Sequence, residues 1–195
     1  MWMYFWISIC SNHSYRGGSM NYTIKTMNSF TVIGFQKEFS NTMSYNDIPD
    51  FWGEVFSRYP LTDTGDIHAK AIRENGIGEF GICIDDLGPD KFRYLIAGRY
   101  AGGEVPEDMV LYTFPESDWA VFDCTGPIPE AIKTITPRIY TEWMPEHPEY
   151  GINGDVTVEW YDAEGDMTAE NYHSAVWIPV YHRQMITAGK GVHNE

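Results

Sequence analysis

The feature that most constrains the fold is an order of elements that the chain repeats. Alternating and continuous apolar runs predict a strand, a helix and two strands in the first half, over residues 30–35, 47–59, 79–85 and 92–100. The same order returns in the second half, over residues 117–125, 127–143, 155–162 and 172–181. Two strand-helix-strand-strand repeats that merge into one antiparallel sheet give an α+β fold with two helices packed on one face. The other face, or a central cleft between the halves, is then a natural ligand pocket.

Both predicted helices carry an apolar stripe. The first has Asn46 or Asp47 as its cap, ends at Pro60, and places its larger apolar residues on one face: Ile48, Phe51, Trp52, Val55, Phe56 and Tyr59. The second presents Ile128, Ile132, Ile135, Ile139 and Trp143 at helical spacing, and Pro137 is expected to kink it. Residues 61–77 are predicted to form a loop with a helical turn near 67–70.

The two ends of the chain differ from the rest. Residues 1–19 begin with an apolar run, Met1 to Cys10, that is shorter than the roughly 20 residues a membrane-spanning helix needs. The run also lacks the basic region and cleavage site of a secretory signal. We therefore expect residues 1–19 to be a leader or an added extension, residues 20–182 to form the domain, and residues 183–195 to be a tail.

The charge, the cysteines and the histidines of the chain restrict the kinds of ligand and partner that we expect. The chain has 28 acidic against 13 basic residues, a net charge of −15, which disfavours direct contact with nucleic acid and suits a cationic ligand. The three cysteines include no CxxC pair, which is typical of a reducing, cytoplasmic setting. The histidines His68, His147, His173 and His182 show no metal-ligand spacing. We therefore expect no metal, no cofactor and no membrane partner.

The segment Asp155–Tyr161 carries the main functional hypothesis. Its alternation predicts a strand with apolar or aromatic residues on both faces, so that Glu159 lies among rings. A buried carboxylate needs a partner or a shifted pKa, and a cationic ligand is one such partner; an edge-strand glutamate in water is the alternative. The rings expected around it are Trp52, Tyr94, Trp119, Tyr140, Trp143, Tyr161 and Trp177. Each cation–π contact would add about 0.5–2 kcal/mol, whereas core packing is the alternative for each tryptophan.

Two other functions remain open from the residues. Glu142, next to Trp143, is either a second acid in the pocket or a solvent-facing helix residue. Two close carboxylates would allow acid–base hydrolysis, with Glu159 as one of them and Tyr140 supplying a proton or orienting the substrate. A third interpretation is an acidic protein-interaction module that imitates the charge of DNA.

Several segments together resemble the GyrI-like small-molecule-binding superfamily, the effector-binding domains of AraC- and MerR-type regulators and of stand-alone proteins. The resemblance covers about residues 22–182 and includes the sequence from Val158 to Tyr161 followed by Trp177-Ile178-Pro179-Val180. The other matching segments are Phe30–Phe35, Phe51–Phe56, Phe92–Tyr100 and Ile135–Pro145.

The resemblance implies a duplicated α+β domain with a ligand cleft between its halves. It places the superfamily's pocket glutamate, which contacts cationic guests, at Glu159, and an aromatic wall at Trp52, Trp119, Tyr140 and Trp143. Some stand-alone relatives hydrolyse cyclopropane-bearing toxic compounds. Because the stretch before residue 22 is too short for a helix-turn-helix, we expect any role in transcription to need a separate DNA-binding or target protein.

Overall fold

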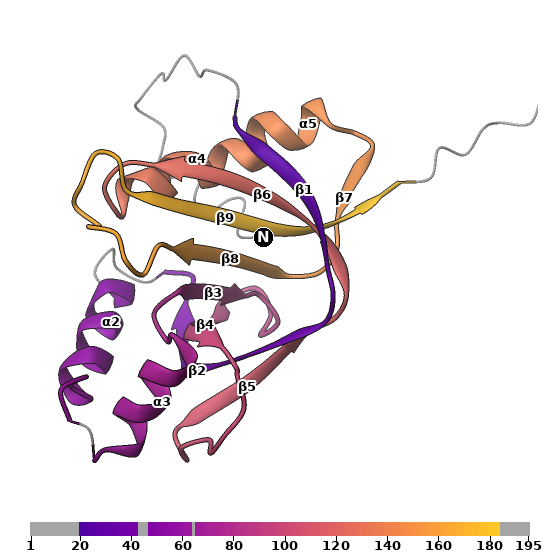
Figure 1. Cartoon of the computed structure of the whole chain (residues 1–195). Coiled ribbons are helices and arrows are strands. Elements are labelled where there is room, and N and C mark those ends of the chain that lie inside the picture. The colour runs from indigo at the N-terminus through magenta and orange to yellow at the C-terminus, as the bar shows by residue number, and fades with distance from the viewer. Residues whose placement is uncertain (1–19, 43–46, 64, 184–195) are drawn as a thin grey trace, which may run out of the picture.

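The computed structural model describes residues 20–42, 47–63 and 65–183 (Figure 1). The strands are β1 Tyr22–Met27, β2 Phe30–Ser40, β3 Phe80–Ile84, β4 Lys91–Arg99, β5 Met109–Phe114, β6 Ser117–Thr125, β7 Tyr150–Ile152, β8 Val156–Tyr161 and β9 His173–His182. The helices are α2 Asp47–Arg58, α3 Ile67–Asn75, α4 Glu130–Arg138, the π-helical turn η1 Ile139–Trp143, and α5 Met144–Glu146.

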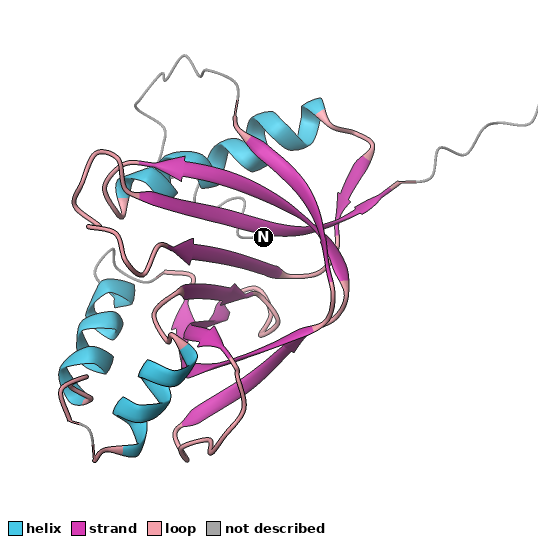
Figure 2. Cartoon of the chain, in the orientation of Figure 1, coloured by secondary structure: helices cyan, strands magenta, loops and turns pink. Residues whose placement is uncertain are grey.

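All strands, magenta in Figure 2, join one antiparallel sheet. Their order is β1-β6-β9-β8-β3-β4-β2-β5, with β7 paired to β9. Strands β2, β4 and β3 mirror β6, β9 and β8, and the two halves meet where β3 pairs β8. The predicted α+β fold with two repeats in one antiparallel sheet is confirmed. The halves also exchange strands, because β1 precedes β2 but pairs β6, and β5 precedes β6 but pairs β2.

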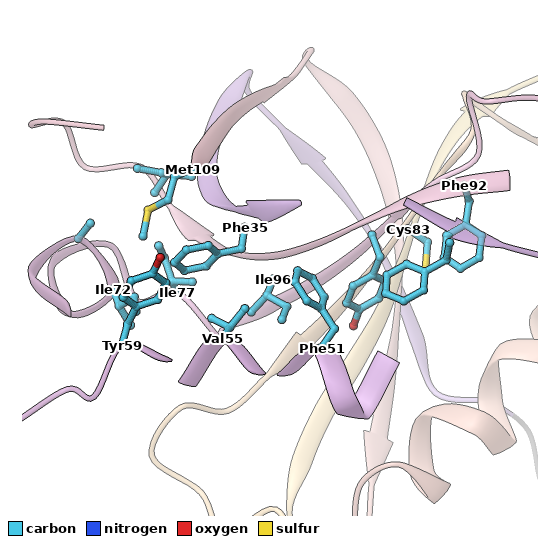
Figure 3. Close-up of a cluster of buried hydrophobic side chains, with 14 residues drawn as sticks. Phe35, Phe51, Val55, Tyr59, Ile72, Ile77, Cys83, Phe92, Ile96 and Met109 are labelled. Carbon is cyan, nitrogen blue, oxygen red and sulfur yellow. The ribbon is translucent and has the colours of Figure 1, made fainter. Parts of the chain in front are cut away.

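Side-chain alternation divides the core between the two faces of the sheet. On one face, α2 and α3 cover the first half, where Phe51 and Val55 point toward Ile96 of β4 (Figure 3). On the same face, α4 and η1 cover the second half. The opposite face carries a third cluster around Phe80, Trp119 and neighbouring strand residues. The seam between β3 and β8 therefore lies between the two helical layers (Figure 1).

The first half contains one helix more than its sequence suggested. The prediction of a loop over 61–77 with a helical turn near 67–70 underestimated the helix, since α3 runs from Ile67 to Asn75. Its ends are well capped: the Asp66 side chain accepts a hydrogen bond from the Ala69 amide at 2.8 Å, and Gly76 ends the helix with a φ of 60°. Ala69, Ala71 and Ile72 are buried, which supplies the packing that a short helix needs.

The second helical layer contains Pro137 and, directly after it, a π-helical turn that was not predicted. Pro137 has no amide hydrogen to donate, and α4 ends one residue later, at Arg138. The next turn, η1, is π-helical, and the Met144 amide reaches back to the Ile139 carbonyl. Ile132, Ile135 and Trp143 of the predicted stripe are all buried against the second half.

The predicted leader 1–19, the cap at Asn46 and most of the tail lie outside the described residues. Within the part of the chain that the structure describes, no helix is both long and apolar enough to cross a bilayer.

Candidate functional site

Glu159 lies in the middle of the sheet, at the seam between the halves. It is paired with Gly81 of β3 on one side and Val176 of β9 on the other. One carboxylate oxygen, Oε2, accepts hydrogen bonds from two phenols: Tyr161 donates at 2.8 Å and Tyr94 at 3.1 Å. Among the described residues, Glu159 forms no ion pair. Its charge is thus held by neutral donors, and no cationic side chain of the described chain neutralises it.

Tyr94 reaches Glu159 by crossing an intervening strand. Tyr94 lies on β4 opposite Cys83 of β3, and β3 in turn pairs β8. The ring passes over Gly81, where a β-carbon would stand 2.2 Å from the Tyr94 hydroxyl oxygen. This crossing joins a donor of the first half to the carboxylate of the second.

Trp52 of α2 covers the group from the helical side. Its indole N–H donates to the Tyr94 hydroxyl at 3.2 Å, and its ring meets Tyr161 edge-on at 5.6 Å between centroids. Trp52 packs against the hydrophobic clusters of both halves. The ring set around Glu159 is therefore Trp52, Tyr94 and Tyr161, which come from three different elements.

The surroundings of Glu159 set its electrostatics. The residue as a whole keeps an intermediate exposure, but its carboxyl group lies among rings, and this loss of hydration raises its pKa. The hydrogen bonds from Tyr161 and Tyr94 oppose that rise. Burial and the neighbouring Glu159 raise the pKa of both tyrosines well above the usual value. Both phenols therefore stay protonated donors across the ordinary pH range.

Tyr140 lies further along the same seam. It comes from η1, and its hydroxyl is 3.3 Å from Thr157 Oγ1, a hydrogen-bonding distance. Thr157 is two residues before Glu159 on the same face of β8. Burial raises the pKa of Tyr140. Tyr140 thus belongs to the β3–β8 seam, with Thr157 as its hydrogen-bond partner.

Trp143 is placed in the core of the second half. It is 1% exposed, meets Phe122 edge-on at 5.1 Å and stacks on His147 at 4.8 Å between centroids. Next to it, Glu142 forms an ion pair with Arg138 at 2.9 Å. The carboxylate of Glu142 is therefore engaged on its own helix.

Trp119 and Trp177 lie on the opposite face of the sheet, and the structure does not bring them together with Glu159. Trp177 pairs with Val158, the residue before Glu159, so strand alternation points it away from the carboxylate. Trp119 is in the same cluster, 6.4 Å from Trp177 between centroids. Both indole nitrogens are buried and lack a hydrogen-bond partner in the described chain.

Two residues of the seam, Gly81 and Thr157, were not identified from the sequence. A glycine in the middle of a β-rich run signals close approach of another group, and Gly81 between Phe80 and Ile82 carries that signal. Thr157 carried none beyond its place two residues before Glu159.

The structure also contains a surface cavity of about 330 Å³ beside α4. It is lined mainly by the end of β6 and the start of α4, including Asp123, Cys124, Glu130 and Ile135. Within the described ranges, no group of three or more His, Cys, Asp or Glu side chains is arranged to hold a metal ion.

A family profile described as "integron-associated effector binding protein" (Cass2) matches residues 23–180. A comparison with curated protein sequences found no match.

Several solved structures share the fold. SAV2435, solved bound to tetraphenylphosphonium, is 23% identical over 83% of this chain and 94% of its own, with a TM-score of 0.64. A protein from Staphylococcus aureus MU50, described as a putative bacterial transcription regulation protein, is 23% identical over 83% of this chain and 99% of its own, with a TM-score of 0.62. The integron cassette protein VCH_CASS2 of Vibrio cholerae is 15% identical over 82% of this chain and 95% of its own, with a TM-score of 0.56.

Proposed function

Because the chain belongs to the Cass2 family of integron-associated effector binding proteins, we propose that it binds a hydrophobic, cationic small molecule at Glu159. The family confirms the expected resemblance to effector-binding domains and supports small-molecule binding. The observation that carries the choice of a cation is the Glu159 carboxylate, held by two phenols with no ion pair in the described chain. A guest cation would supply the missing charge.

The chemistry of the site supports a lipophilic guest. Both phenols donate to the same oxygen, Oε2, and among the described residues no hydrogen bond is donated to Oε1, which is left for a guest. The rings of Trp52 and Tyr161 lie against each other beside the carboxylate, and a cation over the face of either ring would gain about 0.5–2 kcal/mol. The net charge of −15 adds a long-range attraction for cations. SAV2435, which shares the fold, was solved with such a cation, tetraphenylphosphonium.

The arrangement supports binding over hydrolysis on the same site. Tyr140 is hydrogen-bonded to Thr157, and Glu142 is paired with Arg138. Both groups are therefore engaged with partners other than Glu159. A link to transcription or to toxin resistance would then act through a partner that senses the loaded domain.

The test is a titration of tryptophan fluorescence with tetraphenylphosphonium. Trp52 lies on the site, so quenching is expected for the natural sequence and for Glu142→Gln, which changes a carboxylate away from Glu159. Glu159→Gln should weaken binding at least 10-fold, since it removes about 1.4 kcal/mol or more of charge attraction. Triphenylphosphine oxide, a neutral aromatic probe, should bind both forms equally. Equal affinity of Glu159→Gln and the natural sequence for the cation would refute the proposal.

A further inference from the structure

Gly81 lies under the site in the middle of β3, and its missing side chain has a role there. We propose that Gly81 is a positioning residue of the Glu159 site, because only a residue without a side chain lets the Tyr94 hydroxyl cross β3 and hold the carboxylate. The proposal deepens the function above, on which its ligand-binding consequence rests. The hydrogen bond itself can be tested without any ligand.

The distances support this role directly. A β-carbon at position 81 would stand 2.2 Å from the Tyr94 hydroxyl oxygen, 2.9 Å from Glu159 Oε2 and 3.1 Å from the Tyr94 Cζ atom. Real β-carbons essentially never approach a neighbouring atom closer than 3.0 Å. The atom met first is the far end of the tyrosine, so an alanine at this position would push the hydroxyl away from Glu159.

The backbone does not explain the glycine. Gly81 is not among the glycines of this chain with a positive φ, so its conformation is open to any residue. A glycine inside a central strand also weakens that strand, because it has no side chain to pack. The crossing of Tyr94 remains as the physical reason for glycine at this position.

The distance that Tyr94 spans across β3 explains why position 81 must lack a side chain. Neighbouring strands lie about 4.8 Å apart, so β4 and β8, which flank β3, are separated by roughly 10 Å. A tyrosine can bridge that span only by lying flat across the strand between. The Tyr94 side chain is also held by Trp52, whose N–H donates to the hydroxyl at 3.2 Å, and by Phe39, whose ring meets it edge-on at 6.3 Å between centroids.

The pH at which the Glu159 carboxyl titrates depends on the groups that face it. They are Tyr161 on its own strand, Tyr94 from β4, Cys83 from β3, Cys124 from β6 and Trp52 from α2, none of them cationic. Among these, Tyr161 and Tyr94 donate hydrogen bonds that lower the pKa of Glu159. Loss of the Tyr94 bond should therefore raise the pH at which Glu159 titrates.

The experiment follows the ¹³C shift of the Glu159 carboxyl with pH in the full chain, assigned with Glu159→Gln. Gly81→Ala and Tyr94→Phe should each raise the midpoint by about one pH unit, as expected for a lost hydrogen bond to a charged group. The double variant should show no further rise, because both changes remove the same bond. Gly53→Ala, whose β-carbon meets nothing within 4 Å, is the matched control and should leave the midpoint unchanged.

Two results would overturn the proposal: an unchanged midpoint in Gly81→Ala, or shifts that add in the double variant. If Gly81→Ala does not fold, the double variant decides, because Tyr94→Phe removes the nearest atom. Folding restored by that second change supports the crossing, and failure of both contradicts it. Tetraphenylphosphonium binding is measured in parallel. If the natural sequence does not bind it while the midpoints shift as expected, the proposed function fails and the role of Gly81 stands.

Discussion

Glu159 combines two properties that rarely occur together: a buried setting and no cationic partner in the described chain. Removing a carboxylate from water is unfavourable, and two phenol hydrogen bonds offset only part of that loss. Because the lost hydration outweighs the two hydrogen bonds, the pKa of Glu159 is raised. If the proposed function holds, a bound cation would relieve this imbalance.

The raised pKa of Glu159 predicts how the folding stability of the ligand-free protein depends on pH. Because the folded pKa of Glu159 is raised, its contribution to stability is complete below the unfolded pKa and is lost as pH rises through the folded pKa. Glu159→Gln removes that loss, and its amide oxygen can still accept both phenols. We expect the variant to be more stable at neutral pH by about 1 kcal/mol, or roughly 3 °C in melting temperature, with the gap closing in acid. Thermal melts from pH 4 to 8 measure this; a variant that melts below the natural sequence at neutral pH would contradict it.

Sequence reasoning identified the acid but only part of its surroundings. Glu159 was found because its alternation and its aromatic neighbours are local in sequence. The structure places Trp52, Tyr94 and Tyr161 of the predicted rings around it; Tyr161 is two residues away on the same strand, whereas Trp52 and Tyr94 come from distant parts of the chain. The position of Gly81 opposite Glu159 depends on the register of β3 with β8, which no local pattern encodes.

At the scale of elements, strand alternation decides which aromatic rings can meet a guest. Trp177 was expected beside Glu159, but it pairs with Val158 and so projects to the other face. The π-helical turn after Pro137 has a comparable effect, because it directs Tyr140 toward Thr157 while Trp143 stays in the core. The sequence predicted the strand that carries Trp177 and a helix over 127–143, but not the π-helical turn, and the orientation of single rings depends on register and on helix geometry.

Because Trp52 and Trp177 lie on opposite faces of the sheet, their substitutions should affect ligand affinity differently. Trp52→Phe removes the N–H bond to Tyr94 and part of the ring surface near Glu159, so the affinity for tetraphenylphosphonium should fall about 10-fold. Trp177→Phe changes the opposite face and should alter that affinity less than twofold, although it lowers stability. Isothermal titration calorimetry checks both variants. A larger loss of affinity in Trp177→Phe than in Trp52→Phe would be incompatible with the site as placed here.

At the scale of the whole molecule, the site exists only because two related halves share one sheet. Trp52 and Tyr94 come from the first half, Tyr161 and Glu159 from the second, and the central β3–β8 pair joins them. The exchanged strands β1 and β5 tie each half to the other at a second place. The duplication was predicted from the order of elements, but the exchange was not, because it concerns pairing between distant strands.

The shared sheet predicts that ligand binding stabilises the chain as one unit. Tetraphenylphosphonium at 100 times its dissociation constant should add about 2.7 kcal/mol to the free energy of unfolding, or roughly 5–10 °C in melting temperature. Scanning calorimetry should show one transition that moves as a whole. A thermogram with two transitions, of which the ligand shifts only one, would mean that the halves unfold independently.

The most direct measurement is an experimental structure of the chain with tetraphenylphosphonium bound. We predict that the phosphorus atom lies within about 6 Å of the Glu159 carboxylate, with phenyl rings against Trp52 and Tyr161. Ligand density in the cavity beside α4, or elsewhere on the surface, with the Glu159 carboxylate still held only by Tyr94 and Tyr161, would contradict the account.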